Sequence, residues 1–293
     1  MVATKSDQSS FHYQGPIRDH EQFFNRDADV RRVLSRLRKG QSVSVVGKGK
    51  IGKTSFLYYV SQVAARHGFT SQKHLFFHVD CKQLADLSED DCFDQIKAVV
   101  EKRISIGDVC SVPASQGVAC SSAYVWLEQV FSRLQQAGVQ LIVQLDDFEW
   151  LATNTRLGLR LFDNLRALAD VHDAMAYLTT SRVSLCDLQG DIPRVAGSPL
   201  FGIFWDYELK PFESGETRRF VVQRLESLGV ACPEIVLESI SELSQDEPYR
   251  LQIACACACD VRHRSARDLC AKDCAEIKEL FERILRSTLD NSM

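Results

Sequence analysis

The stretch SVSVVGKGKIGKTSFLYYV constrains this chain most, because it fits two phosphate-binding templates at once. Gly47, Gly49 and Gly52 spell G-x-G-x-x-G, the pattern of a dinucleotide-binding turn. The first and last of these glycines, followed by Lys53 and Thr54, spell G-x-x-x-x-G-K-T, the pattern of a P-loop. Both patterns place an anion at the N-terminus of a helix that follows a strand. The stretch therefore predicts a strand, a loop and a helix, and the rest of the chain must decide the ligand.

Lys53 and Thr54 favour the P-loop. A P-loop needs a lysine ammonium that reaches the β- and γ-phosphates and a hydroxyl that binds Mg²⁺, whereas a dinucleotide turn needs neither. A chance match in a chain of this length has odds of about one in a hundred at average residue usage. One residue still supports the dinucleotide-binding interpretation. Asp80 follows the predicted second strand and could hold a ribose hydroxyl. The expected phosphate-binding residues are Gly47, Lys48, Gly49, Lys50, Ile51, Gly52, Lys53, Thr54 and Ser55.

The segment QLIVQLDDFEWL contains the carboxylates that a P-loop site requires. A carboxylate that ends a strand neighbouring the P-loop strand completes the ligand shell of Mg²⁺ bound with ATP. We expect Asp146 to bind Mg²⁺ together with Thr54. Asp147 is placed to orient or deprotonate the attacking water, and Glu149 is the second candidate for that role. The alternative explanation of the paired aspartates is a polar turn after a strand.

A further strand, AMAYLTTSR, ends in Ser181 and Arg182. A cationic group at this position would contact the γ-phosphate and distinguish ATP from ADP. The alternative is an ordinary polar end to a strand.

Strand and helix patterns alternate up to Pro211, which predicts an α/β fold with a parallel five-stranded sheet sandwiched by helices. The expected strands are residues 42–46, 74–79, 140–145, 174–180 and 206–210. The expected helices in this part of the chain are 27–39, before the first strand, and 53–67, 91–104, 123–136 and 155–171, between strands. Beyond Pro211 only helices are expected, at 216–228, 233–243, 248–261 and 272–289. We therefore predict an extended segment at 1–20, a P-loop core at 21–211 and an all-α lid at 212–293.

Composition limits the classes of partner. The formal net charge of −4 argues against nucleic acid, and no apolar run reaches the length of a membrane span. Eleven cysteines without a secretory signal indicate a cytoplasmic, reducing environment. Cys255, Cys259 and His263 are spaced four apart and would share one helix face. The spacing alone leaves open whether this stripe is a metal site or buried core.

The order of these motifs resembles the AAA-like ATPase module of the STAND class, the signal-transduction ATPases with numerous domains, which includes NACHT and NB-ARC modules. FFNRDADVRRVL resembles the family motif F-x-G-R-[DE], with Asn25 in place of the glycine. The resemblance implies that Arg26 borders the adenine and ribose. SQDEPYRLQIACACA resembles the family segment G-x-P, with Asp246 in place of the glycine, and implies that Pro248 lies at the adenine.

The resemblance also implies a fold and a function. The fold is a P-loop NTPase of the ASCE or AAA-like type, and the function is a switch that binds and hydrolyses ATP with Mg²⁺. TTSR resembles the first sensor of the family, with Arg182 facing the γ-phosphate. The ATP state would form a homo-oligomer, and an effector or protein partner that the sequence does not identify would receive the signal. Members usually continue into a winged helix, so the chain is expected to be a short member or the ATPase part of a longer system.

Two other functions stay open. A nucleotide-retaining scaffold without useful turnover is one, and the glycine replacements at Asn25 and Asp246 favour it. The other is an origin-recognition-like AAA+ ATPase that loads onto DNA, although the acidic composition counts against it. The sequence has no N-K-x-D stretch of the kind that reads guanine, which favours ATP over GTP.

Overall fold

The structure is a computed structural model that describes residues 11–106, 122–171, 175–192 and 197–290. These residues divide into two compact units. The α/β unit consists of Arg26–Gly49 and Lys53–Leu209. The helical unit consists of the described parts of Met1–Asn25 and Lys210–Met293, together with Lys50–Gly52.

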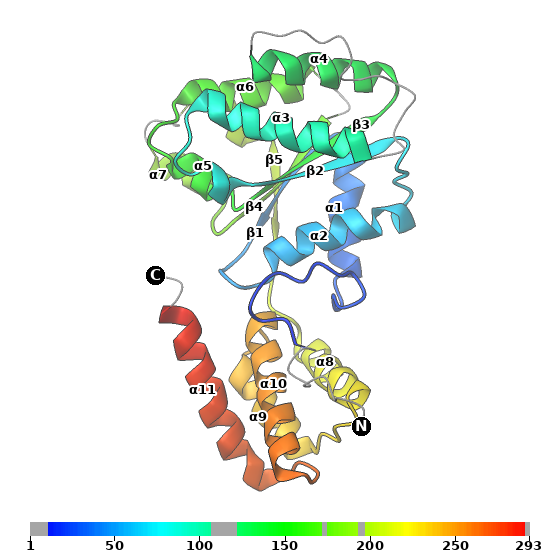
Figure 1. The fold of residues 1–293 in the computed structure, drawn as a ribbon, viewed down its shortest axis with the longest axis vertical. Coiled ribbons are helices and arrows are strands. Elements are labelled where there is room, and N and C mark those ends of the chain that lie inside the picture. Colours follow the sequence, from blue (N-terminus) through cyan, green and yellow to red (C-terminus); the bar gives the residue numbers. More distant parts are fainter. Residues whose placement is uncertain (1–10, 107–121, 172–174, 193–196, 291–293) are drawn as a thin grey trace. The chain divides into compact units, whose positions relative to one another are not determined.

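The α/β unit contains a five-stranded sheet in the order β2-β3-β4-β1-β5 (Figure 1). Its strands are β1 (Ser42–Val46), β2 (His74–Asp80), β3 (Gln140–Asp146), β4 (Met175–Ser181) and β5 (Phe204–Glu208). Every pairing in the sheet is parallel, as the alternation of strands and helices predicts. The α/β fold class with a parallel five-stranded sheet is therefore confirmed.

The strand order corrects one expectation. The sequence places Asp146 at the end of a strand neighbouring the P-loop strand, but β4 lies between β1 and β3. A crossover helix allows a strand to pair with one far along the chain, so sequence order does not fix adjacency.

Helices cover both faces of the sheet, as Figure 1 shows. The helices are α1 (Asp27–Leu37) and α2 (Lys53–Val63) on one face, and α3 (Glu89–Ile106), α4 (Ala123–Gln136) and α6 (Leu159–Val171) on the other. Successive strand residues point to opposite faces, so Leu141, Val143 and Leu145 enter the core under α3, α4 and α6. Ile142 is also fully buried but faces the other way. Side chains on both faces of the sheet are buried, which explains why the strand sequences are continuous runs of apolar residues.

The helix expected at residues 155–171 begins later than predicted, at Leu159, because a turn around Asn154 precedes it. The side-chain amide of Asn154 donates to the carbonyl oxygens of Leu84 and Leu87, both at 2.9 Å, and its oxygen accepts the N–H of Arg156 at 2.9 Å. This turn separates α6 from a short helix that the sequence patterns did not predict. The remaining short elements of this unit are η2 (Ala64–His67), η3 (Cys81–Leu84), α5 (Glu149–Thr153), α7 (Leu185–Asp191) and η4 (Pro199–Ile203).

The helical unit has its own hydrophobic core. Its elements are α8 (Ser214–Ser227), α9 (Glu234–Ser244), α10 (Pro248–Ser265), η5 (Ala271–Asp273) and α11 (Cys274–Asp290). Cys255 and Cys259 are buried in this core, whereas His263 is exposed. Among the described residues no group of three or more His, Cys, Asp and Glu side chains is placed to hold a metal, so the cysteine stripe is core. Nor does any helix in the described ranges combine the length and apolar character needed to cross a membrane.

Residues 11–25 pack against the same helical core. Phe11 is buried there, and the ring of Phe24 meets those of Phe212 and Phe220 edge-on at 5.8 and 5.2 Å. The sequence assigns residues 21–25 to the P-loop core, but their contacts group them with the helical unit. Residues 1–10 of the predicted extended segment lie outside the described residues.

Candidate phosphate-binding site

The carboxyl ends of β1, β4 and β3 meet at one edge of the sheet. Val46 lies opposite Ser181, and Thr179 lies opposite Leu145. The carbonyl oxygen of Ser181 accepts the N–H of Gly47, the first residue of the P-loop, at 3.1 Å. The P-loop and the paired aspartates therefore start from strands that end at the same level, although β4 separates them.

Lys53 is held at the centre of the P-loop. It is the first residue of α2 and is 6% exposed, and its ammonium donates to the carbonyl oxygens of Gly47 at 2.7 Å and Lys48 at 3.1 Å. Burial lowers the pKa of Lys53, and Glu149 makes the largest opposing contribution. Gly52 has φ 98°, a conformation that residues with a Cβ rarely adopt. The first N–H groups of α2 have no partner within the helix, so this turn is suited to an anion.

The two predicted Mg²⁺ ligands are in contact. The carboxylate of Asp146 is 4% exposed and accepts the hydroxyl of Thr180 at 2.6 Å, and Thr54 lies close enough to it to lower its pKa. Burial raises the pKa of Asp146, while the hydrogen bonds from Thr180 and Thr54 lower it. A carboxylate and a hydroxyl in contact fit a hard divalent cation such as Mg²⁺.

Asp147 is engaged on both its backbone and its side chain. Its φ is 53°, and its N–H donates to the hydroxyl oxygen of Thr180 at 2.7 Å. Its carboxylate pairs with the ammonium of Lys82 at 2.7 Å, and this hydrogen bond raises the pKa of Lys82.

Glu149, the first residue of α5, is in a different environment. Its side chain is 16% exposed, and neither carboxylate oxygen has a hydrogen-bond partner outside its own residue among the described residues. The guanidinium Nε of Arg182 lies 3.5 Å away, and burial raises the pKa of Glu149. Arg182 itself is 66% exposed. Glu149 and Arg182 therefore face the same region as Lys53.

The two residues expected at the adenine belong to different units. Arg26, which precedes α1, is 8% exposed and pairs with Asp29 at 3.2 Å. Pro248 is the first residue of α10. Arg26 belongs to the α/β unit and Pro248 to the helical unit, and their roles at the adenine stay predictions.

Sequence reasoning missed Thr180 and Lys82. Thr180 bonds both aspartates, and the signal for it was present, because a hydroxyl at the end of a strand that borders a phosphate loop is chemically useful. Lys82 lies just after β2, and the sequence carries no sign that it would meet Asp147.

The strand order excludes the dinucleotide interpretation. In a dinucleotide-binding fold the second strand lies beside the first, so its terminal acidic residue reaches the ribose. Here β3 and β4 separate β2 from β1. Asp80 instead accepts the N–H of Lys82 at 3.0 Å and caps η3.

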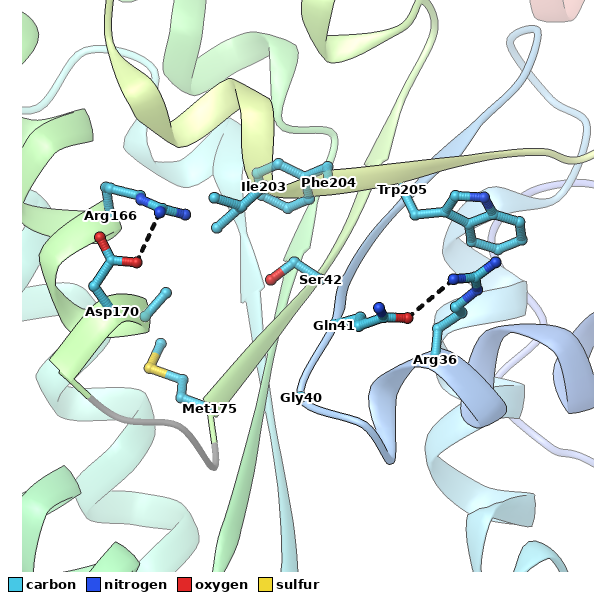
Figure 2. A pocket seen from close by; sticks show the side chains of 11 residues that line it. Arg36, Gly40, Gln41, Ser42, Arg166, Asp170, Met175, Ile203, Phe204 and Trp205 are labelled. Atoms are coloured by element: carbon cyan, nitrogen blue, oxygen red, sulfur yellow. Dashed lines mark hydrogen bonds and ion pairs between the residues drawn. The ribbon is translucent and has the colours of Figure 1, made fainter.

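A pocket of about 420 Å³ lies at the amino ends of β1, β4 and β5 (Figure 2). Arg36 stacks over the ring of Trp205 at 4.7 Å and donates to Gln41 at 3.1 Å, while Arg166 pairs with Asp170 at 2.8 Å. Its lining includes none of the predicted phosphate-binding residues, and both of its guanidinium groups are engaged by neighbours. This pocket is therefore separate from the P-loop edge of the sheet.

Comparison with known families matches the chain to the family described as Novel STAND NTPase 2, over residues 38–293. The chain belongs to this family. Together, the family and the fold make this Novel STAND NTPase 2 chain a P-loop NTPase of the STAND and AAA+ kind. A search of the curated proteins found no match.

Solved structures agree on the fold of this Novel STAND NTPase 2 chain. A Walker-type ATPase of Pyrococcus abyssi superposes with a TM-score of 0.70 at 15% identity, over 95% of this chain and 77% of that one. The ADP form of the Aeropyrum pernix ORC2 protein superposes with a TM-score of 0.60 at 17% identity, over 94% of this chain and 72% of that one. The structure of Drosophila ORC bound to DNA superposes with a TM-score of 0.64 at 11% identity, over 97% of this chain and 67% of that one. At these identities the likeness concerns the fold alone.

Proposed function

We propose that this P-loop NTPase binds ATP with Mg²⁺ and hydrolyses it as a molecular switch. The observation that carries the proposal is that Thr54 lies beside the buried carboxylate of Asp146, at the edge of the sheet where the P-loop holds the ammonium of Lys53. These three groups come from two segments far apart in the chain, and their chemistry matches a magnesium triphosphate.

Each group then has a role. The main-chain N–H groups of residues 49–54 and the ammonium of Lys53 bind the phosphates. Thr54 and Asp146 hold Mg²⁺, which neutralises charge on the phosphates when bound. A carboxylate at the same edge, Asp147 or Glu149, orients the attacking water. Arg182 contacts the γ-phosphate and so distinguishes ATP from ADP.

A switch requires that ATP and ADP favour different conformations. The size of the shift is limited by the difference in affinity of each nucleotide for the two conformations. Assembly into a homo-oligomer in the ATP state, and a protein effector, follow from the resemblance to STAND ATPases and belong to the same proposal.

Thermal unfolding tests nucleotide binding directly. ATP with Mg²⁺ at about a hundredfold above its dissociation constant stabilises the native protein by about 2.7 kcal/mol. The variant Lys53→Ala should lose this shift, whereas Lys278→Ala, a matched change on α11, should keep it. Melts that respond to a nicotinamide dinucleotide and not to ATP would overturn the proposal.

Two alternatives make different predictions. A scaffold would show the ATP shift in melting without any release of phosphate. A DNA-loading ATPase is compatible with the fold, because structural neighbours include an ORC assembly bound to DNA. That function predicts binding of duplex DNA that weakens steeply as salt rises, which fluorescence anisotropy measures.

A further inference from the structure

Three carboxylates lie together at the carboxyl edge of the sheet, and each has a different set of partners. Asp146 is bonded by Thr54 and Thr180. The next carboxylate along the chain, Asp147, is bonded by Lys82. Neither Glu149 oxygen has a hydrogen-bond partner outside its own residue among the described residues. The three side chains are therefore not equivalent candidates for one role.

The carboxylate of Asp147 is already paired with a cation. Lys82 belongs to η3, the segment after β2, and β2 is the strand furthest from β1 in this half of the sheet. The ion pair at 2.7 Å directs the Asp147 carboxylate toward η3 and neutralises its charge. Thr180 also fixes its N–H at 2.7 Å. One of the two carboxylate oxygens of Asp147 is thus occupied by Lys82, which gives this side chain a structural partner that Glu149 lacks.

Glu149 has the opposite character. A buried carboxylate without hydrogen bonds is costly and uncommon in native proteins, so it indicates a group that a ligand or water completes. Its nearest cation is Arg182, at 3.5 Å. Arg182 directly follows Ser181, whose carbonyl oxygen accepts the N–H of Gly47 in the P-loop at 3.1 Å. Glu149 and Arg182 therefore lie at the P-loop edge of the sheet, where the γ-phosphate is expected.

We propose that Glu149 is the catalytic residue that accepts the proton of the attacking water, and that Asp147 serves as the structural partner of Lys82. This inference rests on the proposed function, because it needs ATP in the site. The water oxygen forms a bond to the γ-phosphorus, and the bond from that phosphorus to the β–γ bridging oxygen breaks. The bond's electron pair stays on ADP, and Glu149 takes the proton that the water loses. Arg182, which is 66% exposed, pairs with Glu149 until the γ-phosphate competes for it.

The test compares two isosteric variants in the full chain. Glu149→Gln should lower the rate of phosphate release by at least about a hundredfold, the usual contribution of a general base, with ATP affinity kept within about threefold. Asp147→Asn should lower turnover at least about tenfold less than Glu149→Gln does, and asparagine tolerates its φ of 53°. Glu226→Gln, an exposed change on α8, is the matched control. Binding of a fluorescent ATP analogue with Mg²⁺ shows that each variant is folded.

Each other outcome counts against the inference. The inference is overturned if Asp147→Asn loses turnover while Glu149→Gln keeps it. It is also overturned if both variants lose turnover to the same degree, or if both keep it. If the unaltered chain binds ATP but releases no phosphate, the inference fails while nucleotide binding stands. An unaltered chain that binds no ATP contradicts the proposed function itself, which separates the two failures.

Discussion

Asn25 and Asp246 occupy positions where the motifs of the STAND class have glycine. Both residues have a left-handed backbone conformation, with φ of 46° and 60°. Asparagine and aspartate tolerate this region better than other residues with a Cβ. Each adds a hydrogen bond that glycine cannot make. The amide of Asn25 donates to Glu216, and the carboxylate of Asp246 accepts the hydroxyl of Thr217 at 2.6 Å. Both turns therefore keep a glycine-like backbone conformation, so these replacements no longer favour the scaffold function.

The first prediction separates strain from hydrogen bonding at Asp246. Asp246→Ala loses the bond to Thr217 and keeps the left-handed backbone, which costs about 1–2 kcal/mol for an alanine. Asp246→Gly loses the same bond without that strain. We expect the alanine variant to be less stable than the glycine variant by about 1 kcal/mol or more in urea unfolding. Equal stability of the two variants would contradict this account.

The second prediction concerns pH and Asp273. Two hydrogen bonds from Arg267, at 2.7 and 2.9 Å, and one from the N–H of Cys270 lower the pKa of Asp273 from 3.8 to about 2. A lowered folded-state pKa gives stability that is complete above the ordinary pKa and is lost as pH falls toward the folded value. Asp273→Asn should therefore be less stable than the unaltered chain at neutral pH, and the gap should narrow between about pH 4 and pH 2. Urea midpoints across this range measure the gap, and a gap independent of pH would refute the assignment.

At the scale of elements, β4 organises the candidate site. Its terminal residues bond the P-loop on one side and the aspartate turn on the other, through Ser181 to Gly47 and through Thr180 to the residues after β3. The carbonyl oxygen of Thr180 also accepts the N–H of Phe148 at 2.8 Å. A strand inserted between β1 and β3 thus sets the spacing between the phosphate loop and the carboxylates.

The third prediction tests this bridging role. Thr180→Val keeps the shape of the fully buried side chain and removes its hydroxyl. The carboxylate of Asp146 and the N–H of Asp147 then lose a partner, so stability should fall by about 1–3 kcal/mol. Thr180→Ser keeps the hydroxyl and should lose only about 1 kcal/mol, from the missing methyl group. Urea unfolding compares the two, and a valine variant as stable as the serine variant would contradict the role.

At the scale of the whole molecule, the residues that the structure describes form two hydrophobic cores. Every carboxylate of the candidate site, with Lys53, Thr54 and Arg182, belongs to the α/β unit. The proposed side-chain contacts to Mg²⁺ and the γ-phosphate therefore come from one unit, whereas Lys50–Gly52 and Pro248 group with the other.

The fourth prediction uses metal removal. Because Thr54 and Asp146 are the proposed ligands, chelation of Mg²⁺ should remove most of the stabilisation by ATP. Asp146→Asn should show the small ATP shift of the chelated protein whether or not Mg²⁺ is present. Melting curves with ATP and Mg²⁺, and with ATP and a chelator, give both values. A variant that keeps a full Mg²⁺-dependent shift would place the metal elsewhere.

The sequence by itself determined the elements and the motifs, because these depend on neighbours along the chain. Apolar runs, helix-period patterns and glycine positions placed every strand to within two residues of its bounds and located the P-loop and the aspartates after β3. The chemistry of lysine, hydroxyl and carboxylate side chains then predicted a shared site.

Only the tertiary structure decided which residues meet across the fold. The order of the strands placed β4 between β1 and β3, and it excluded Asp80 as a ribose ligand. Lys82 comes from a segment far from Asp147 in the sequence, and their pairing distinguishes Asp147 from Glu149, whose oxygens accept no hydrogen bond from another described residue. Burial and ion pairing are properties of three-dimensional neighbours, so no local pattern distinguishes one of these acidic residues from another.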